Sequence, residues 1–295
     1  MYSNEWRIGI IGLGKMGGAV AEAIINAEMD VTVYDVNPKA VTSLVEIGAN
    51  AAIDIVDVAK SSNIILTILP NTEIVSNVYE SLLENAVPET RFIDLSTIDP
   101  NFIRTLNESV QRKNCILVDL PVSGSPQEAR DGNLVLLAGC ESLEVLEGIE
   151  PLLKCFGHKI HFIGKPGDAK AVKIVNNLMT LGNIAVAAEA FSIGEKFGIN
   201  PNLLFNVLNQ SGGRSHQFSK RFPFVLERDF DGRFSIELGE KDLGIGINLS
   251  KSLGIPTPIA SLIQQIYSIT KYEGYGKEDI VSVVKIYEEW GSVSK

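Results

Sequence analysis

Two polar residues inside a long apolar stretch carry the side chains best suited to chemistry in this sequence. Lys173 and Asn177 stand four residues apart, a spacing that places both on one face of a helix. Burying a polar group without a partner costs roughly 1 to 3 kcal/mol, and an unpaired charge costs more. We therefore interpret the pair as facing an active site between two domains. The alternative is a lysine that reaches the surface beside two amides, Asn176 and Asn177.

The stretch that holds these residues is predicted to form one long helix. It follows Gly167, contains no proline up to about Phe197, and repeats apolar residues at helical spacing around most of its circumference. Such a helix is expected to be buried on several sides. The apolar positions are Ala171, Val172, Val175, Leu178, Met179, Leu181, Ile184, Ala185, Ala188 and Phe191.

A glycine-rich turn follows the first predicted strand. Residues 7–11 run into Gly12-Leu13-Gly14-Lys15-Met16-Gly17, and an apolar-periodic helix continues to about residue 27. Strand, G-x-G-x-x-G and helix in this order form a fingerprint of dinucleotide binding. The glycines permit a tight turn and a close approach of the pyrophosphate, which the N–H groups and dipole of the helix would attract. The alternative is a simple tight turn.

An acidic residue follows the second predicted strand. Asp35 lies 18 residues after Gly17, at about the distance where a carboxylate accepts hydrogen bonds from the ribose hydroxyls of NAD. A carboxylate there repels the 2′-phosphate of NADP, so NAD is favoured as the cofactor. NADP stays an alternative because the positively charged Lys39 lies nearby in the sequence. The alternative for Asp35 is an ordinary turn residue in Asp-Val-Asn-Pro.

Strand and helix patterns alternate through the first half of the chain. Strands are predicted at 7–11, 31–34, 64–69, 91–95, 115–122, 134–139 and 159–163, and helices at 38–47, 73–85 and 100–113. This alternation predicts an α/β Rossmann domain, with a doubly wound and mostly parallel sheet, over residues 1–165. Ligands of such sheets bind beyond the carboxyl ends of the strands. The loops there are Leu69-Pro-Asn-Thr, Leu95-Ser-Thr-Ile-Asp and Pro121-Val-Ser-Gly-Ser.

The strand signal ends near Asp168, so residues 166–295 are predicted to form an all-helical domain, joined to the first by the long helix. Further helices are expected at 201–208, 238–253, 258–271 and 277–290. The aromatic and charged segment 221–234 is expected to be a solvated loop with aromatic anchors in the core. Arg214, Ser215 and His216 are weaker candidates for the border of a substrate site.

The bulk composition excludes several classes of protein. A chain of 295 residues with 45% hydrophobic and 21% charged residues is an ordinary globular protein. The net charge of −10 argues against nucleic-acid binding. Three cysteines without metal-ligand spacing predict a reduced, cytoplasmic protein with no metal site. We see no signal peptide and no apolar run as long as a membrane span, roughly 18 to 20 residues.

Together these blocks resemble the β-hydroxyacid dehydrogenase family, which includes 3-hydroxyisobutyrate dehydrogenase and sulfolactaldehyde reductase. The resemblance covers nearly the whole chain. It rests on the glycine-rich turn, Asp94-Leu-Ser-Thr-Ile-Asp-Pro, Asp119-Leu-Pro-Val-Ser-Gly, Gly167-Asp-Ala-Lys-Ala-Val-Lys-Ile-Val-Asn-Asn and Lys241-Asp-Leu-Gly.

The resemblance implies a role for each matching residue. Lys173 would be the catalytic acid and base, and Asn177, Ser123 and Gly124 would hold the substrate's carboxylate or hydroxyl. The family has Val-Ser-Gly-Gly where this chain has Val-Ser-Gly-Ser125, so Ser125 adds a side chain beside the acid group and leaves the identity of that acid open. The resemblance also implies a homodimer or homotetramer. The implied cofactor contacts are Leu69, Pro70, Thr97 and Lys241.

The implied activity is reversible hydride transfer between NAD and a small 3-hydroxy acid, or a sulfonate analogue, and its semialdehyde. A lysine has an unperturbed pKa of about 10.4, so the Lys173 ammonium suits reduction near neutrality. Oxidation needs the neutral amine and is expected to be favoured at alkaline pH.

Two alternatives to this activity remain open. The first is an enzyme of the same fold that acts on a larger or phosphorylated acid, as 6-phosphogluconate dehydrogenases do. This chain looks too short for the extended helical domain of those enzymes. The second is a non-catalytic NAD-binding protein of this fold, and such relatives tend to lose the lysine.

Overall fold

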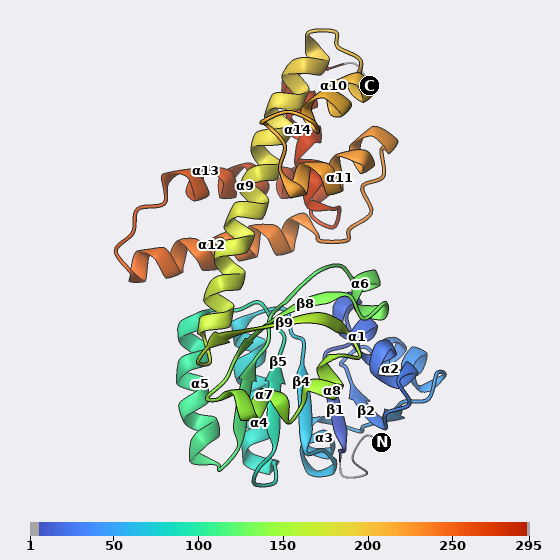
Figure 1. Ribbon diagram of the computed structural model, residues 1–295, viewed down its shortest axis with the longest axis vertical. Coiled ribbons are helices and arrows are strands. Elements are labelled where there is room, and N and C mark those ends of the chain that lie inside the picture. The colour runs from blue at the N-terminus through green and yellow to red at the C-terminus, as the bar shows by residue number, and fades with distance from the viewer. Residues whose placement is uncertain (1–5, 294–295) are drawn as a thin grey trace. The chain divides into compact units, whose positions relative to one another are not determined.

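The computed structural model describes residues 6–293, and the chain divides into two compact units, Met1–Lys173 and Ile174–Lys295. The first unit is an α/β unit built on one twisted sheet, and the second is helical (Figure 1). A Rossmann-type unit followed by a helical one is the fold class that the sequence predicted. The long helix α9, Asp168–Lys196, is continuous through the division between them.

The sheet of the first unit has the strand order β3-β2-β1-β4-β5-β6-β8-β7, with β9 paired to β8. The path from β3 to β6 is parallel, β8 is antiparallel to β6 and β7, and β9 is parallel to β8. The strands are β1 Ile8–Ile11, β2 Val31–Tyr34, β3 Asn50–Ala51, β4 Ile64–Thr67, β5 Arg91–Asp94, β6 Ile116–Asp119, β7 Val122–Ser123, β8 Leu134–Gly139 and β9 Gly157–Gly164.

Helices cover both faces of this sheet because its central strands are apolar on both sides. In β4, Ile64 and Leu66 join one buried cluster and Ile65 joins the other, as the alternation of a strand requires. The helices are α1 Lys15–Asn26, α2 Pro38–Val45, α3 Ile55–Ser61, α4 Thr72–Asn85, α5 Pro100–Arg112, α6 Pro126–Arg130, α7 Leu143–Glu147 and α8 Glu150–Leu153. The sequence reading had not located α3, α6, α7 and α8, which are seven residues or shorter and too brief for a helical period to stand out.

The helical unit packs around α9 (Figure 1). Leu181, Ile184, Ala188 and Phe191 of α9 are buried in its core. The other elements are α10 Pro201–Leu208, α11 His216–Glu227, α12 Ile236–Ser252, α13 Pro258–Thr270, the short helices η1 Lys271–Tyr275 and η2 Ile280–Ser282, and α14 Val283–Gly291.

The structure corrects the first half of the loop predicted at 221–234, while residues 228–234 lie outside any helix or strand, as expected. Residues 216–227 form α11, which buries Phe218 and Phe222 against Phe191 of α9. Pro223 lies inside this helix, and the helical pattern was hidden by the proline and by the charged residues around it. The aromatic anchors were predicted correctly, but they sit on a helix.

A second correction concerns the surface of α9. The sequence predicted burial on several sides, yet Val175, Met179, Val186 and Ile193 are 53 to 67% exposed. These positions form one stripe, because the core of the helical unit covers only the opposite side. Contrary to the sequence reading, α9 is also long and apolar enough to cross a membrane by length and composition alone. The core helix of a folded unit can have the same length and composition, and α9 contributes buried residues to the core of the helical unit.

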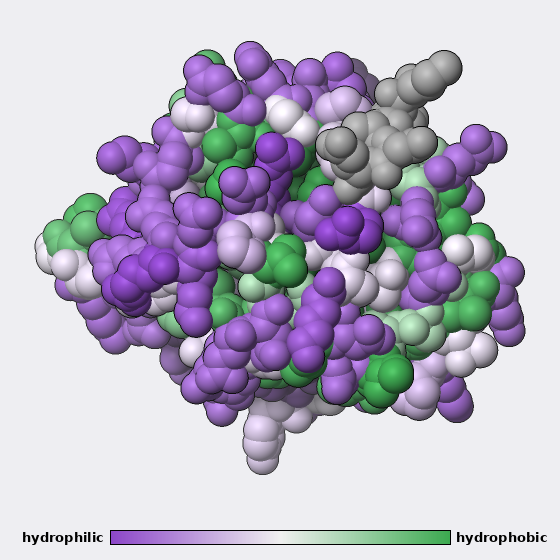
Figure 2. Space-filling model, turned by 90° about the horizontal axis from the view of Figure 1, so that it is seen from below, coloured by the Kyte–Doolittle hydropathy of each residue, from purple (hydrophilic) through white to green (hydrophobic). Residues whose placement is uncertain are grey.

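The surface seen in Figure 2 is mostly hydrophilic, with scattered hydrophobic side chains. Such scattered apolar residues are ordinary for a folded protein. The three cysteines, Cys115, Cys140 and Cys155, are free thiols.

Candidate active site

The glycine-rich turn lies where the strand order of the sheet reverses. β1 is flanked by β2 on one side and β4 on the other, and ligands of such sheets bind at this point, beyond the strand ends. Gly12 has φ +93°, and a Cβ there would lie 2.3 Å from the Ile68 carbonyl oxygen. A Cβ on Gly17 would lie 1.9 Å from the carbonyl oxygen of Gly12. Both positions therefore require glycine.

Gly14 differs from the other two glycines of the turn. Apart from Gly14 itself and its two chain neighbours, no heavy atom of residues 6–293 lies within 4 Å of the position its Cβ would take. The protein's own packing thus leaves this side of the backbone open, and Gly14 directly precedes the first residue of α1. An open backbone at a helix N-terminus fits the approach of a pyrophosphate, the role predicted for this glycine. Leu13 is buried, Lys15 is exposed and Met16 is half-buried.

The carboxylate of Asp35 is held against the glycine-rich turn. Its Oδ2 accepts a hydrogen bond from the backbone N–H of Leu13 at 2.6 Å, and its Oδ1 accepts one from Asn37 at 2.7 Å. Asp35 therefore does structure the turn that follows β2. A carboxylate offers about four acceptor positions, so each oxygen keeps capacity for a ribose hydroxyl.

The loops after β4 and β5 are tied together by a serine. The backbone N–H of Leu69 donates to Ser96 Oγ at 2.9 Å, and this hydroxyl donates to Asp94 Oδ2 at 3.0 Å. Leu69 is half-buried and Pro70 is exposed, and Thr97 follows Ser96 in the neighbouring loop. The predicted cofactor contacts Leu69, Pro70 and Thr97 are thus on adjacent loops at the same edge of the sheet.

A buried ion cluster at this edge was missed by the sequence reading. The ammonium of Lys170 is completely buried and lies 2.9 Å from Asp94 Oδ1 and 2.9 Å from Asp119 Oδ1. The sequence analysis singled out Lys173, Asn176 and Asn177 on the long helix and did not consider Lys170. A signal was available, because Asp94 and Asp119 end neighbouring buried strands and two buried carboxylates need a cation.

Burial and charge act in opposite directions on this cluster. Burial lowers the pKa of Lys170, but the charges of Asp119 and Asp94 outweigh it and hold the pKa above the ordinary value. Burial raises the pKa of Asp119 above its ordinary value. Lys170 and the backbone N–H groups of Gly167 and Lys170 lower this pKa but do not outweigh the burial.

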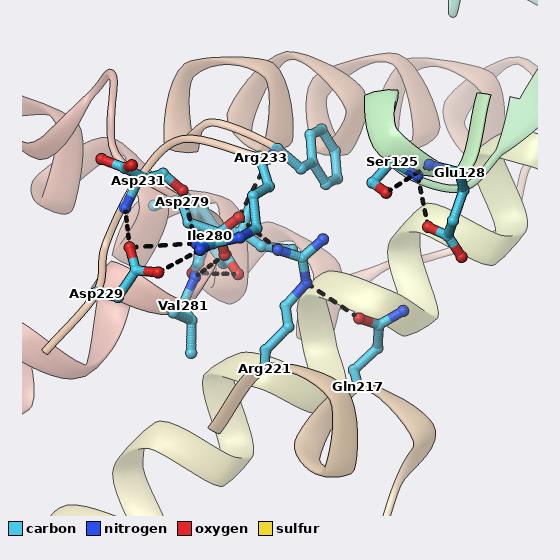
Figure 3. Close-up of polar contacts among 12 residues, drawn as sticks. Ser125, Glu128, Gln217, Arg221, Asp229, Asp231, Arg233, Asp279, Ile280 and Val281 are labelled. Carbon is cyan, nitrogen blue, oxygen red and sulfur yellow. Dashed lines mark hydrogen bonds and ion pairs between the residues drawn. The ribbon is translucent and has the colours of Figure 1, made fainter. Parts of the chain in front are cut away.

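The loop predicted to bind the substrate's acid group follows β6. Gly124 has φ +148°, and a Cβ there would lie 2.4 Å from Leu134 Cδ2. Ser125 caps α6: its hydroxyl accepts from the Glu128 N–H at 3.3 Å, and its own N–H donates to Glu128 Oε2 at 2.7 Å (Figure 3). The extra side chain of Ser125 therefore has a structural task as a helix cap, and Ser123 is half-buried beside it.

Lys173 and Asn177 lie one turn apart on α9, as predicted. Lys173 is half-buried and Asn177 is 3% exposed. Asn177 Nδ2 donates to Asp242 Oδ2 at 2.6 Å, and Asn177 Oδ1 accepts from Asn176 Nδ2 at 3.2 Å. The amide of Asn177 is thereby fixed in one orientation.

Asp242 is a second residue that the sequence reading did not single out. It is buried on α12, and the ammonium of Lys241, a predicted cofactor contact, lies 3.2 Å from its Oδ1. Only its place beside Lys241 in the Lys241-Asp-Leu-Gly block marked it in the sequence.

The weaker candidates before α11 have local partners. Ser215 Oγ caps this helix by accepting from the Phe218 N–H at 3.0 Å, and Arg214 Nε donates to Ser219 Oγ at 3.1 Å. A role for Arg214, Ser215 and His216 at a substrate stays a prediction. Over residues 6–293, no group of three or more His, Cys, Asp or Glu residues is placed to hold a metal ion.

The strand order of the sheet and the open glycine-rich turn at its reversal place this chain in the class of dinucleotide-binding proteins. The pattern of the NAD binding domain of 6-phosphogluconate dehydrogenase matches residues 7–164. The pattern described as NAD-binding of NADP-dependent 3-hydroxyisobutyrate dehydrogenase matches residues 167–287. The chain belongs to the β-hydroxyacid dehydrogenase family, whose members include 3-hydroxyisobutyrate dehydrogenase.

Relatives match along nearly their whole length. The chain is 34% identical to 2-(hydroxymethyl)glutarate dehydrogenase of Eubacterium barkeri, over 98% of this chain and 97% of the relative. It is 32% identical to 3-sulfolactaldehyde reductase of Escherichia coli, over 94% of each. The structure of Mycobacterium tuberculosis 3-hydroxyisobutyrate dehydrogenase with L-serine superposes with a TM-score of 0.88 at 26% identity, covering 95% of this chain and 98% of that one.

The matched segments and the two compact units divide the chain at slightly different points. The first pattern ends at residue 164, the second begins at 167, and the compact units meet at 173 and 174. The predicted domains 1–165 and 166–295 stay a prediction.

Proposed function

We propose that this protein is an NAD-preferring dehydrogenase that interconverts a small 3-hydroxy acid, or its sulfonate analogue, and the corresponding semialdehyde. The observation that carries this proposal is the placement of Lys173 and Asn177 one turn apart on α9, with the Asn177 amide oriented by Asp242. The family supports the type of reaction. The choice of cofactor rests on Asp35, and the choice of substrate rests on Ser123, Gly124 and Ser125.

Preference for NAD is supported by Asp35. Its carboxylate is fixed at the end of β2 by two backbone N–H groups, so it cannot turn away from a cofactor that carries a 2′-phosphate. A negative charge held there repels the phosphate and accepts from the ribose hydroxyls. The glycine-rich turn from Gly12 to Gly17, with Leu69, Pro70, Thr97 and Lys241, would hold the remainder of the cofactor.

Lys173 is proposed to move the proton. When bound, the nicotinamide ring supplies or accepts the hydride. In the direction of reduction the Lys173 ammonium donates a proton to the forming alkoxide, and in oxidation the neutral amine accepts the hydroxyl proton. Asn177 is proposed to orient the substrate hydroxyl or the lysine, because Asp242 already holds its amide.

Ser123 and Gly124 are proposed to bind the acid group of the substrate through a hydroxyl and a backbone N–H. Neither group carries charge, so a carboxylate and a sulfonate are both compatible with them. Ser125 is proposed to limit which acid group can bind. Its hydrogen bonds with Glu128 at the start of α6 fix the position of the loop that holds Ser123 and Gly124. Two relatives are named for a carboxylated and a sulfonated substrate, 2-(hydroxymethyl)glutarate and 3-sulfolactaldehyde, and both kinds of acid group are compatible with this proposal.

The first test is a substrate panel followed by absorbance at the NADH band. NAD and NADP are offered separately with 3-hydroxyisobutyrate, glycerate, serine and 4-hydroxybutyrate, and the semialdehydes and sulfolactaldehyde are offered in reverse. We expect turnover of one of these with NAD. Tight NAD binding with silence on every acid would contradict the proposal and favour the non-catalytic alternative, and turnover of phosphorylated acids alone would favour a dehydrogenase of larger acids.

We also propose that a second copy of the chain covers the exposed stripe of α9. The stripe borders a groove of about 670 Å³ within the helical unit, whose lining includes Met179, Val186, Phe218 and Ile259. Large exposed apolar patches are uncommon on monomers, and most soluble oligomers are built from copies of one chain. Light scattering is expected to give at least twice the mass of one chain, and a monomer mass at micromolar concentration would overturn this point.

A further inference from the structure

The buried cluster of Lys170, Asp94 and Asp119 has more connections than ion pairing requires. Lys170 Nζ lies 2.9 Å from one oxygen of each carboxylate and donates a hydrogen bond to the carbonyl oxygen of Asp94 at 2.8 Å. All three side chains are fully buried. A buried ion cluster of this kind is weak evidence for stability, because removing charges from water offsets their attraction.

Each carboxylate also holds a different part of the α/β unit. Asp119 Oδ2 accepts from the backbone N–H groups of Gly167 at 2.8 Å and Lys170 at 3.1 Å, so it caps the start of α9 from the end of β6. Gly167 enters the helix with φ +97°. These hydrogen bonds hold the first turn of α9 at the carboxyl end of β6.

Asp94 fastens the neighbouring loops. It accepts from Thr67 Oγ1 at 2.6 Å and from Ser96 Oγ at 3.0 Å, and Ser96 Oγ accepts from the Leu69 N–H. The register of the sheet pairs Thr67 with Asp94 and Asp94 with Asp119. The cluster therefore spans the ends of three adjacent parallel strands.

We propose that Lys170, Asp94 and Asp119 are positioning residues for the dehydrogenase reaction. Lys173 follows Lys170 by three residues on α9, and residues three apart are neighbours on a helix surface. Lys170 joins the carboxylate that caps this helix to the carboxylate that holds the Leu69 loop. The cluster thus sets the catalytic lysine against the cofactor loops within one unit. This inference rests on the proposed function of Lys173.

The test replaces all three charges together, because removing Lys170 alone would leave two buried carboxylates without a cation. In the triple variant Lys170→Met, Asp94→Asn and Asp119→Asn, the two amides keep acceptor oxygens for the backbone and hydroxyl donors. We expect kcat to fall by about 10- to 100-fold, as small displacements of a catalytic group do, with the KM for the hydroxy acid within about threefold of the original.

A deuterium isotope effect separates positioning from loss of folded enzyme. With substrate deuterated at the carbinol carbon, a misplaced Lys173 slows the chemical step, so the isotope effect on kcat rises. A merely smaller fraction of folded protein lowers kcat and leaves the isotope effect unchanged. A folded triple variant with unaltered kcat and isotope effect would overturn the inference.

The helical unit offers a matched control. Asp279 is buried, pairs with Arg221, and accepts from the backbone N–H groups of Phe234 at 3.1 Å and Val281 at 3.2 Å (Figure 3). The double variant Arg221→Met and Asp279→Asn is expected to lower the melting temperature and leave the isotope effect unchanged. An equal rise of the isotope effect in this control would also overturn the inference.

If the triple variant does not fold, Asp119→Asn alone is used, since it retains the pairing of Lys170 with Asp94, and an unaltered isotope effect in that variant counts against the inference. Absence of turnover by the unaltered protein on every hydroxy acid refutes the proposed function itself, before any variant is compared.

Discussion

Substitution by alanine is expected to lower stability at Gly17 of the dinucleotide turn and to lower cofactor affinity at Gly14. A Cβ on Gly17 would sit 1.9 Å from the Gly12 carbonyl oxygen, so the two backbones must separate by about 1.1 Å to reach even the shortest contact seen in real structures, 3.0 Å. Overpacking of this kind costs about 1 to 3 kcal/mol. At roughly 2 to 4 °C per kcal/mol for a unit of this size, Gly17→Ala should lower the melting temperature by about 2 to 12 °C.

Gly14→Ala meets no neighbouring protein atom within residues 6–293. Its melting temperature should therefore stay within about 2 °C of the original, because no packing is disturbed. The added methyl instead occupies the space proposed for the pyrophosphate. We expect the Kd for NADH to rise about tenfold or more, which corresponds to about 1.4 kcal/mol.

The assay pairs thermal melting with titration of NADH fluorescence for both variants and for Gly212→Ala. A Cβ on Gly212 would also meet no heavy atom of the described residues within 4 Å beyond its chain neighbours, and Gly212 lies outside the dinucleotide turn, so this control should change neither quantity. The reasoning is refuted if Gly14→Ala binds NADH as tightly as the original, since the pyrophosphate would then lie elsewhere.

Two other predictions follow from charged groups of the α/β unit. Asp35→Asn removes the charge that repels a 2′-phosphate and should raise kcat/KM for NADP relative to NAD by about tenfold, near 1.4 kcal/mol; an unchanged ratio would remove Asp35 from cofactor choice. The pKa of Lys170 is raised in the folded protein, so the stability that its ammonium contributes is present below the ordinary value of 10.5 and is lost as the pH rises through the folded-state pKa. The melting temperature should then fall above about pH 10.5 more steeply in the original protein than in the triple variant without these charges, and parallel curves would contradict this assignment.

Much of the α/β unit could be predicted from its sequence because its signals are local. The buried strands of β-branched residues and the glycine-rich turn each occupy a few consecutive positions, and Asp35 directly follows one of these strands. The register of the sheet then brings the loops after β4, β5 and β6 to one edge without further information. The prediction of cofactor loops at that edge needed only the parallel order of the strands.

The contacts that cross between distant segments were not predictable in the same way. Lys170 meets Asp94 and Asp119 only after α9 docks on the sheet, and Asn177 meets Asp242 across 65 positions of sequence. Each partner looks like an ordinary polar residue when it is read alone. α11 was missed for a different reason, since Pro223 and its charged neighbours conceal a helix whose stability comes from burying Phe218 and Phe222.

The most direct test of the account is the rate of hydride transfer in Lys173→Met, measured in a single turnover with the substrate that the panel identifies. Glu189→Gln, at an exposed position on the same helix, serves as the control. We expect Lys173→Met to fold and to bind NADH normally, while hydride transfer slows by about 100- to 10,000-fold, the usual contribution of a general acid or base. Hydride transfer at the original rate in folded Lys173→Met would contradict the central claim.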